Sequence, residues 1–274
     1  SDVCSSDLAA RNILAELGGH EFRVDKVQKR TVRKNPAPPF TTSKLQQESI
    51  RRLRFTAKKT MMLAQQLYEG IDLGPGEPVG LITYMRTDST RIAETAADEA
   101  RQHILEQFGR DYALDRPRVF KNSKQAQDAH EAIRPTSVAN TPERVAPHLS
   151  RDQLALYQLV WQRFVASQMQ EALIDQVSAS IAAGPYVFTA SGSAVKFPGF
   201  MALYRAVEED AEGNGNGDKA REQLPELTEG QRLALQRLEP RQHFTQPPPR
   251  FSEASLVKEL EENGIGRPST YAAI

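Results

Sequence analysis

Cysteine is almost absent from this sequence, because Cys4 is the single thiol among 274 residues. One thiol cannot form an internal disulfide, and it cannot supply the cysteine set of a zinc site. No apolar run approaches the roughly 20 residues that a membrane-spanning helix needs. A secretory signal pattern is also missing. We therefore expect a cytoplasmic protein with no membrane partner.

Net charge is lacking as well, since 35 basic residues balance 35 acidic ones. The balance hides a segregation, because residues 26–34 and 51–59 each hold five Lys or Arg and no acid. Local field rather than net charge steers a polyanion toward a protein. The two basic runs are therefore candidate nucleic-acid contacts, and the alternative is that each is a solvated face.

The pattern of apolar residues predicts a mixed α and β, multidomain protein. Residues 1–8 read like translated linker sequence, and we leave them out of fold arguments. We expect a first β-rich part at 9–40, a helical domain at 41–170, and a second β-rich part at 171–245. Residues 246–274 look like the start of a further helical domain, and the whole chain looks like an internal fragment.

Several element boundaries follow from local signals. Ser43 with Gln46, and Ser150 with Gln153, have the spacing of a capping box. A helix over 57–69 is expected to bury Leu67 and Tyr68. The remaining expected elements are a short strand at 79–82, a helix at 91–108, strands within 177–197 and 231–238, a helix at 252–263, and a helix capped by Ser269.

Tyr84 is the strongest candidate for chemistry. It follows the apolar run at 79–82 and is followed by Arg86, Asp88 and Ser89. A tyrosine hydroxyl in such a polar turn can act as a nucleophile. The planar guanidinium of Arg86 suits two phosphate oxygens at once. Taken alone, this spacing also fits a structural tyrosine at the end of a strand.

Five stretches resemble motifs of bacterial DNA topoisomerase I, the type IA family, and they occur in the family's order. They are Pro38 to Glu48, Lys59 to Gly70, Tyr84 to Thr90 (YMRTDST), Asp128 to Pro135, and Arg250 to Lys258 continued by Gly264 to Tyr271. The resemblance implies a helical domain that carries the tyrosine and is inserted in a β-rich arch.

The resemblance also implies the reaction and its catalytic residues. Tyr84 would form a 5′-phosphotyrosyl intermediate with one DNA strand, and negatively supercoiled DNA would be relaxed by strand passage and religation without ATP. Arg86 would contact the scissile phosphate, and His130 would organise the site through hydrogen bonds. Mg²⁺ would be bound by an acidic N-terminal domain of the same polypeptide, since these 274 residues contain no Asp-x-Asp-x-Asp run. The fragment alone is therefore expected to be inactive.

Further residues are candidate contacts to single-stranded DNA. Lys44, Gln46 and Gln47 are expected to face the groove. Arg134 is either a phosphate contact or the partner in a structural ion pair. At the start of the last expected helix, Arg267, Ser269 and Thr270 would bind phosphate through free backbone N–H groups, or would only cap that helix.

Two alternatives remain beside a monomeric topoisomerase I. One is another type IA enzyme, topoisomerase III or reverse gyrase, although Met85 and the segment at 38–42 favour topoisomerase I. The other is a module that binds single-stranded DNA and performs no chemistry. An acidic domain encoded upstream would favour an enzyme over the binding module.

Overall fold

A computed structural model of the chain describes residues 7–120, 130–204 and 224–273. The chain divides into two compact units. The sheet unit comprises residues 1–34, 173–197 and 208–249, and the helical unit comprises residues 35–172, 198–207 and 250–274. Each unit is built from segments distant in the sequence, and each is described below by itself.

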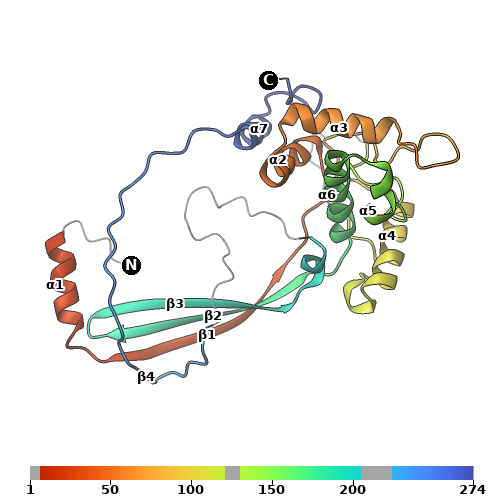
Figure 1. The fold of residues 1–274 in the computed structure, drawn as a ribbon. Coiled ribbons are helices and arrows are strands. Elements are labelled where there is room, and N and C mark those ends of the chain that lie inside the picture. Colours follow the sequence, from red (N-terminus) through yellow and green to blue (C-terminus); the bar gives the residue numbers. More distant parts are fainter. Residues whose placement is uncertain (1–6, 121–129, 205–223, 274) are drawn as a thin grey trace. The chain divides into compact units, whose positions relative to one another are not determined.

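The sheet unit is a four-stranded sheet in the order β3-β2-β1-β4. Its elements are α1 (Asp7–Leu17), β1 (Phe22–Lys34), β2 (Ala172–Ala183), β3 (Tyr186–Phe197) and β4 (Arg232–Leu233). Strands β2 and β3 form a long antiparallel hairpin (Figure 1). Gly184 turns this hairpin with φ of 58°, a conformation that favours glycine. A small core joins Leu17, Phe22 and Ala183.

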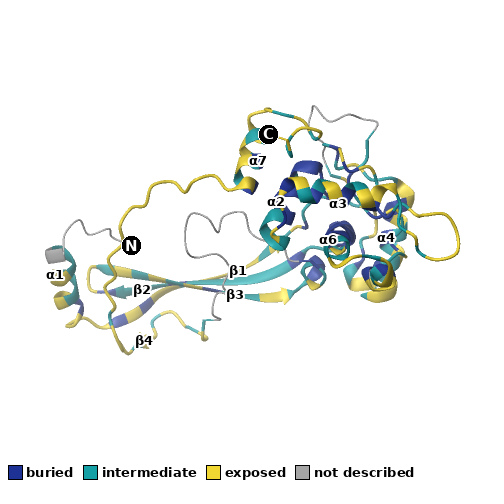
Figure 2. Ribbon diagram, turned by 45° about the horizontal axis from the view of Figure 1, so that its top comes forward, coloured by how far each residue is buried: buried dark blue, intermediate teal, exposed yellow. Residues whose placement is uncertain are grey.

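The helical unit holds the larger core. Its α-helices are α2 (Thr42–Leu53), α3 (Ala57–Glu69), α4 (Glu94–Gln107), α5 (Pro142–Val145), α6 (Arg151–Ser167) and α7 (Glu253–Glu262). Short 3₁₀ turns, η1 (Arg110–Tyr112), η2 (Ala146–His148) and η3 (Gly199–Ala202), complete it. Burial is greatest along α6, where Leu156, Tyr157 and Phe164 are inaccessible (Figure 2). None of the helices within the described ranges is long and apolar enough to cross a membrane.

The expected mixed α and β class is confirmed, and so is the capping box of Ser150 and Gln153. The box at Ser43 was wrong. Thr41 is the N-cap of α2, and its side chain accepts a hydrogen bond from the backbone N–H of Lys44. Ser43 therefore lies within the first turn of the helix, and its hydroxyl is available for a partner outside α2.

Three other expectations needed correction. No regular strand precedes Tyr84, because Val79 and Ile82 each form only an isolated bridge. The strand expected at 231–238 is reduced to Arg232–Leu233. The stretch 268–273 forms hydrogen-bonded turns and not a helix. In each case, the pattern of apolar and polar residues was read correctly. It does not indicate how many backbone hydrogen-bond partners the segment finds.

Candidate active site around Tyr84

Three of the sequence motifs meet in the helical unit. The backbone N–H of Ile133 donates to the carbonyl of Phe40 over 2.8 Å, and that of Thr83 donates to the carbonyl of Arg134 over 2.9 Å. The Thr83 hydroxyl also donates to the carbonyl of Ala132 over 2.7 Å. The segment that leads to Tyr84 is therefore held by long-range contacts on both sides.

The beginning of helix α2 holds the segment that follows Tyr84. The hydroxyl of Thr42, the first residue of α2, donates to the carbonyl of Met85 over 2.7 Å. The same hydroxyl accepts from the N–H of Thr87 over 2.9 Å, and the N–H of Thr42 donates to the carbonyl of Thr87 over 2.9 Å. Thr42 is fully buried, so these bonds are shielded from water. Residues 85–87 are therefore fixed to the end of a helix.

The segment alternates between buried and exposed side chains. Met85 and Thr87 are each 1% exposed, whereas Tyr84 is 42% exposed and Arg86 is exposed. Tyr84 and Arg86 are therefore both accessible, while the backbone between and after them is held by Thr42.

Two rings contact the ring of Tyr84. Tyr68 packs edge-on with ring centroids 5.4 Å apart, and the His130 ring lies 6.1 Å away. Within the described residues, the Tyr84 hydroxyl has no hydrogen-bond partner. Tyr68 was expected in the buried stripe of α3, but it is 41% exposed and borders the candidate site. Tyr68 lies in the last turn of α3, and helical periodicity alone does not take this position into account.

Arg134 forms a structural ion pair, which was one of the two roles expected for it. Its guanidinium binds the Glu131 carboxylate through Nε and a terminal nitrogen, each over 2.8 Å. A third bond joins it to the Pro135 carbonyl over 2.9 Å. These bonds use three of the five N–H donors of the guanidinium, so Arg134 forms the structural ion pair and keeps two donors for a further partner. Asp128, in the same motif, lies outside the described residues.

The candidate DNA contacts on α2 are largely covered. Gln46 is 0% exposed and Gln47 is 1% exposed, while Lys44 is half-buried. Helix α7 lies against α2 and covers this face (Figure 1). In this structure, therefore, Gln46 and Gln47 are inaccessible to solvent.

Arg267, Ser269 and Thr270 are exposed and lie in the turn after α7. The Thr270 hydroxyl accepts from the N–H of Arg267 over 2.8 Å, so it closes the turn. The free helical N–H groups that the sequence predicted here are not formed within residues 268–273.

The described ranges 7–120, 130–204 and 224–273 contain no group of three or more His, Cys, Asp or Glu side chains that could hold a metal ion. The carboxylates that Mg²⁺ prefers are thus not gathered near Tyr84. These residues do not fit a magnesium site.

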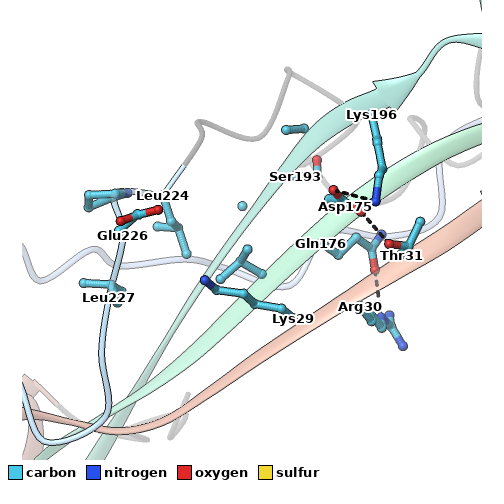
Figure 3. A pocket seen from close by; sticks show the side chains of 14 residues that line it. Lys29, Arg30, Thr31, Asp175, Gln176, Ser193, Lys196, Leu224, Glu226 and Leu227 are labelled. Carbon is cyan, nitrogen blue, oxygen red and sulfur yellow. Dashed lines mark hydrogen bonds and ion pairs between the residues drawn. The ribbon is translucent and has the colours of Figure 1, made fainter.

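A hollow of about 490 Å³ lies on the sheet unit, between strands β1 to β3 and residues 224–227 (Figure 3). Its polar groups are partly paired with one another. The Thr31 hydroxyl donates to Asp175 over 2.6 Å, the Lys196 ammonium lies 3.9 Å from Asp175, and Arg30 donates to Gln176 over 3.0 Å. Lys29, from the first basic run, extends into the hollow (Figure 3).

Comparison with known proteins settles the family. The sequence model of the DNA topoisomerase family matches residues 2–274. The chain belongs to this family. Its fold is similar to that of full-length topoisomerase I from Thermotoga maritima, with a TM-score of 0.79 and 35% sequence identity. The match covers 100% of this chain and 42% of the Thermotoga chain. The resemblance to bacterial type IA topoisomerases is thereby confirmed.

Gly80 provides a test of how this topoisomerase segment is held. A Cβ atom at this position would lie 2.7 Å from the backbone oxygen of Tyr68. We expect Gly80→Ala to push the end of α3 away and to destabilise the helical unit by about 1–3 kcal/mol. Denaturant unfolding followed by the fluorescence of Trp161, the single tryptophan, would report this.

Gly18→Ala, in the sheet unit, is the control for the same chemical change without a close contact. Its nearest atom, the oxygen of Ala15, would lie 3.6 Å from the new Cβ, which is an ordinary contact. Equal midpoints for the two variants would show that the approach of Tyr68 to Gly80 does not constrain the site.

Proposed function

We propose that this chain carries the nucleophile of a type IA DNA topoisomerase, and that Tyr84 is that nucleophile. One observation carries the proposal. An exposed tyrosine and an exposed arginine lie two residues apart in a segment where Met85 and Thr87 are buried and the backbone is bonded to Thr42. Such fixed placement of two functional groups is what covalent catalysis needs.

The proposed cleavage step exchanges one phosphodiester for another. The Tyr84 Oη atom attacks a phosphorus of single-stranded DNA, and the bond from phosphorus to the 3′ oxygen breaks with its electron pair on that oxygen. The tyrosine proton is lost and the 3′ oxygen gains one, so a 5′-phosphotyrosyl bond and a 3′ hydroxyl result. Religation is the reverse reaction. Because one ester replaces another, no ATP is consumed.

Arg86 and His130 have supporting roles in this proposal. The Arg86 guanidinium would bind the phosphate oxygens and stabilise the charge that develops on them. His130, whose ring lies 6.1 Å from that of Tyr84, would order the site by hydrogen bonds once DNA is bound. We propose magnesium for a complete enzyme, without a binding site among the described residues and without a role for it in the step above.

The linkage to DNA tests the function. A complete enzyme that contains this segment would be incubated with a single-stranded oligonucleotide labelled at either its 5′ or its 3′ end, then denatured. We expect the label to stay with the protein when it is 3′ to the break, on a peptide that contains Tyr84. A 3′ linkage, or an adduct on another residue, would refute the assignment.

The two alternatives need different measurements. A topoisomerase III-like enzyme would give the same adduct, and a comparison of decatenation with relaxation would separate it. A module that only binds single strands would retain DNA and form no adduct. We also propose a cytoplasmic, nucleoid-associated location and a monomeric state.

The two basic runs predict a salt dependence. Lys26, Lys29, Arg30 and Arg33 on β1 are all exposed. If these cations neutralise phosphates, the log of the affinity for single strands should fall with log salt by about 0.7 for each phosphate neutralised. We expect Lys29→Gln to reduce this slope by about 0.7.

Lys196→Gln is the control, since the Lys196 ammonium already lies near the Asp175 carboxylate. Titrations by fluorescence anisotropy at several salt concentrations would give both slopes. Affinity that does not change with salt would identify the basic runs as solvated faces.

A further inference from the structure

Helix α7 packs against a polar face of α2. Stable contacts between helices are usually apolar. The buried α7 residues Ala254 and Val257, together with Glu261, are spaced three and four residues apart. They therefore form one stripe along α7. The Glu261 carboxylate accepts hydrogen bonds from the Ser43 hydroxyl and, over 3.5 Å, from the Gln47 amide.

The covered face contains polar atoms that this contact leaves without partners. They are both amide atoms of Gln46 and the amide oxygen of Gln47, all in buried positions and unpaired within the described residues. Buried polar groups are nearly always hydrogen-bonded, because leaving them unpaired costs free energy. This face is buried, but its polar atoms lack hydrogen-bond partners. A polar ligand that supplies those partners would therefore bind here better than α7 does.

From these contacts we infer that the α2 face formed by Ser43, Gln46 and Gln47 is a subsite for a backbone phosphate of single-stranded DNA. The Glu261 carboxylate occupies this subsite until DNA displaces α7. This inference rests on the proposed function. Its chemistry is that of anion binding, because the Ser43 hydroxyl and the Gln47 amide already donate to an anionic oxygen.

The position of the subsite connects it with the nucleophile. Ser43 directly follows Thr42, whose hydroxyl holds the backbone of Met85 and Thr87. Tyr271 lies near both Glu261 and Asp88. Burial raises the pKa of its hydroxyl, the negative charges of those two residues raise it further, and Arg267 lowers it. The subsite at Ser43 is therefore adjacent in sequence to the residue that anchors the Tyr84 segment.

Glu261→Gln tests the inference in the 274-residue chain. The substitution keeps the size of the side chain and removes the charge that competes with phosphate. We expect about a tenfold gain in affinity for single-stranded oligodeoxythymidine, measured by fluorescence anisotropy at fixed salt. Adding Ser43→Ala to this variant should remove most of the gain.

Glu262→Gln is the matched control, since it removes the same charge from the same helix. Glu262 is exposed, and its carboxylate lies 4.0 Å from Lys258 on α7 itself. An equal gain for Glu262→Gln, or no gain for Glu261→Gln, would overturn the subsite.

Hydrogen exchange of the unmodified chain gives an independent readout that no folding defect can obscure. Oligodeoxythymidine should speed the exchange of the α7 amides, and protection of α7 that is unchanged or increased would also overturn the subsite. If neither the unmodified chain nor the Glu261→Gln variant binds DNA, the result refutes both the subsite and DNA as the partner in the proposed function. Binding that is indifferent to Glu261 would refute the subsite alone.

Discussion

Replacing Tyr84 with phenylalanine should abolish the covalent protein–DNA adduct of a complete enzyme that contains this segment. Phenylalanine keeps the ring contacts with Tyr68 and His130 and removes only the Oη nucleophile. Tyr84 is 42% exposed, so the change in unfolding free energy should stay within about 0.5 kcal/mol. Denaturing gel electrophoresis with labelled single-stranded DNA measures the adduct, and anisotropy should show that DNA binding persists.

Tyr68→Phe is the control for that experiment. It removes a second exposed hydroxyl, on a ring 5.4 Å from that of Tyr84, and should leave the adduct in place. Adduct formation by the Tyr84 variant would show that another group is the nucleophile.

The second large effect concerns the 274-residue chain tested by itself. We expect it to fold, to bind single-stranded DNA weakly, and to form no adduct with magnesium present. Its described residues place Tyr84 and Arg86 together but gather no metal-binding group of carboxylates. Loss of a set of groups that act as a unit typically costs several powers of ten in rate.

Adduct yield with and without the added acidic domain of a type IA enzyme would measure this effect. The fluorescence of buried Trp161 would verify that the helical unit is folded in both samples. Relaxation of a supercoiled plasmid by the 274-residue chain alone would show that its active site is self-contained.

The choice of Tyr84 and Arg86 as candidate site residues could be made from the sequence, because a polar turn that follows an apolar run favours exposed functional side chains. The absence of a strand around them could not be predicted. Val79 and Ile82 have the apolar character of a strand, but each finds only a single bridging partner, and those partners, Ile71 and Pro135, come from separate segments.

The burial of Gln46 and Gln47 shows a different limit. Helical periodicity indicates that Ser43, Gln46 and Ile50 share one side of α2, but it does not indicate what lies against that side. Glu261, which accepts hydrogen bonds from Ser43 and Gln47 on this helix, comes from a helix more than 200 positions further along the chain. In a single sequence, a polar helix face is interpreted as solvent-exposed. Its burial could therefore be found only from the structure.

The bonds that fix residues 83–87 have a consequence for folding. They join positions 45 and 51 residues apart, as in the contacts of Thr42 with Thr87 and of Thr83 with Arg134. Contacts of such separation require two loops to close before they contribute free energy. Thr42 and Arg134 must both be in place before the segment acquires its shape. The position of the tyrosine is therefore a property of the completed helical unit, and a short peptide of the same sequence would not possess it.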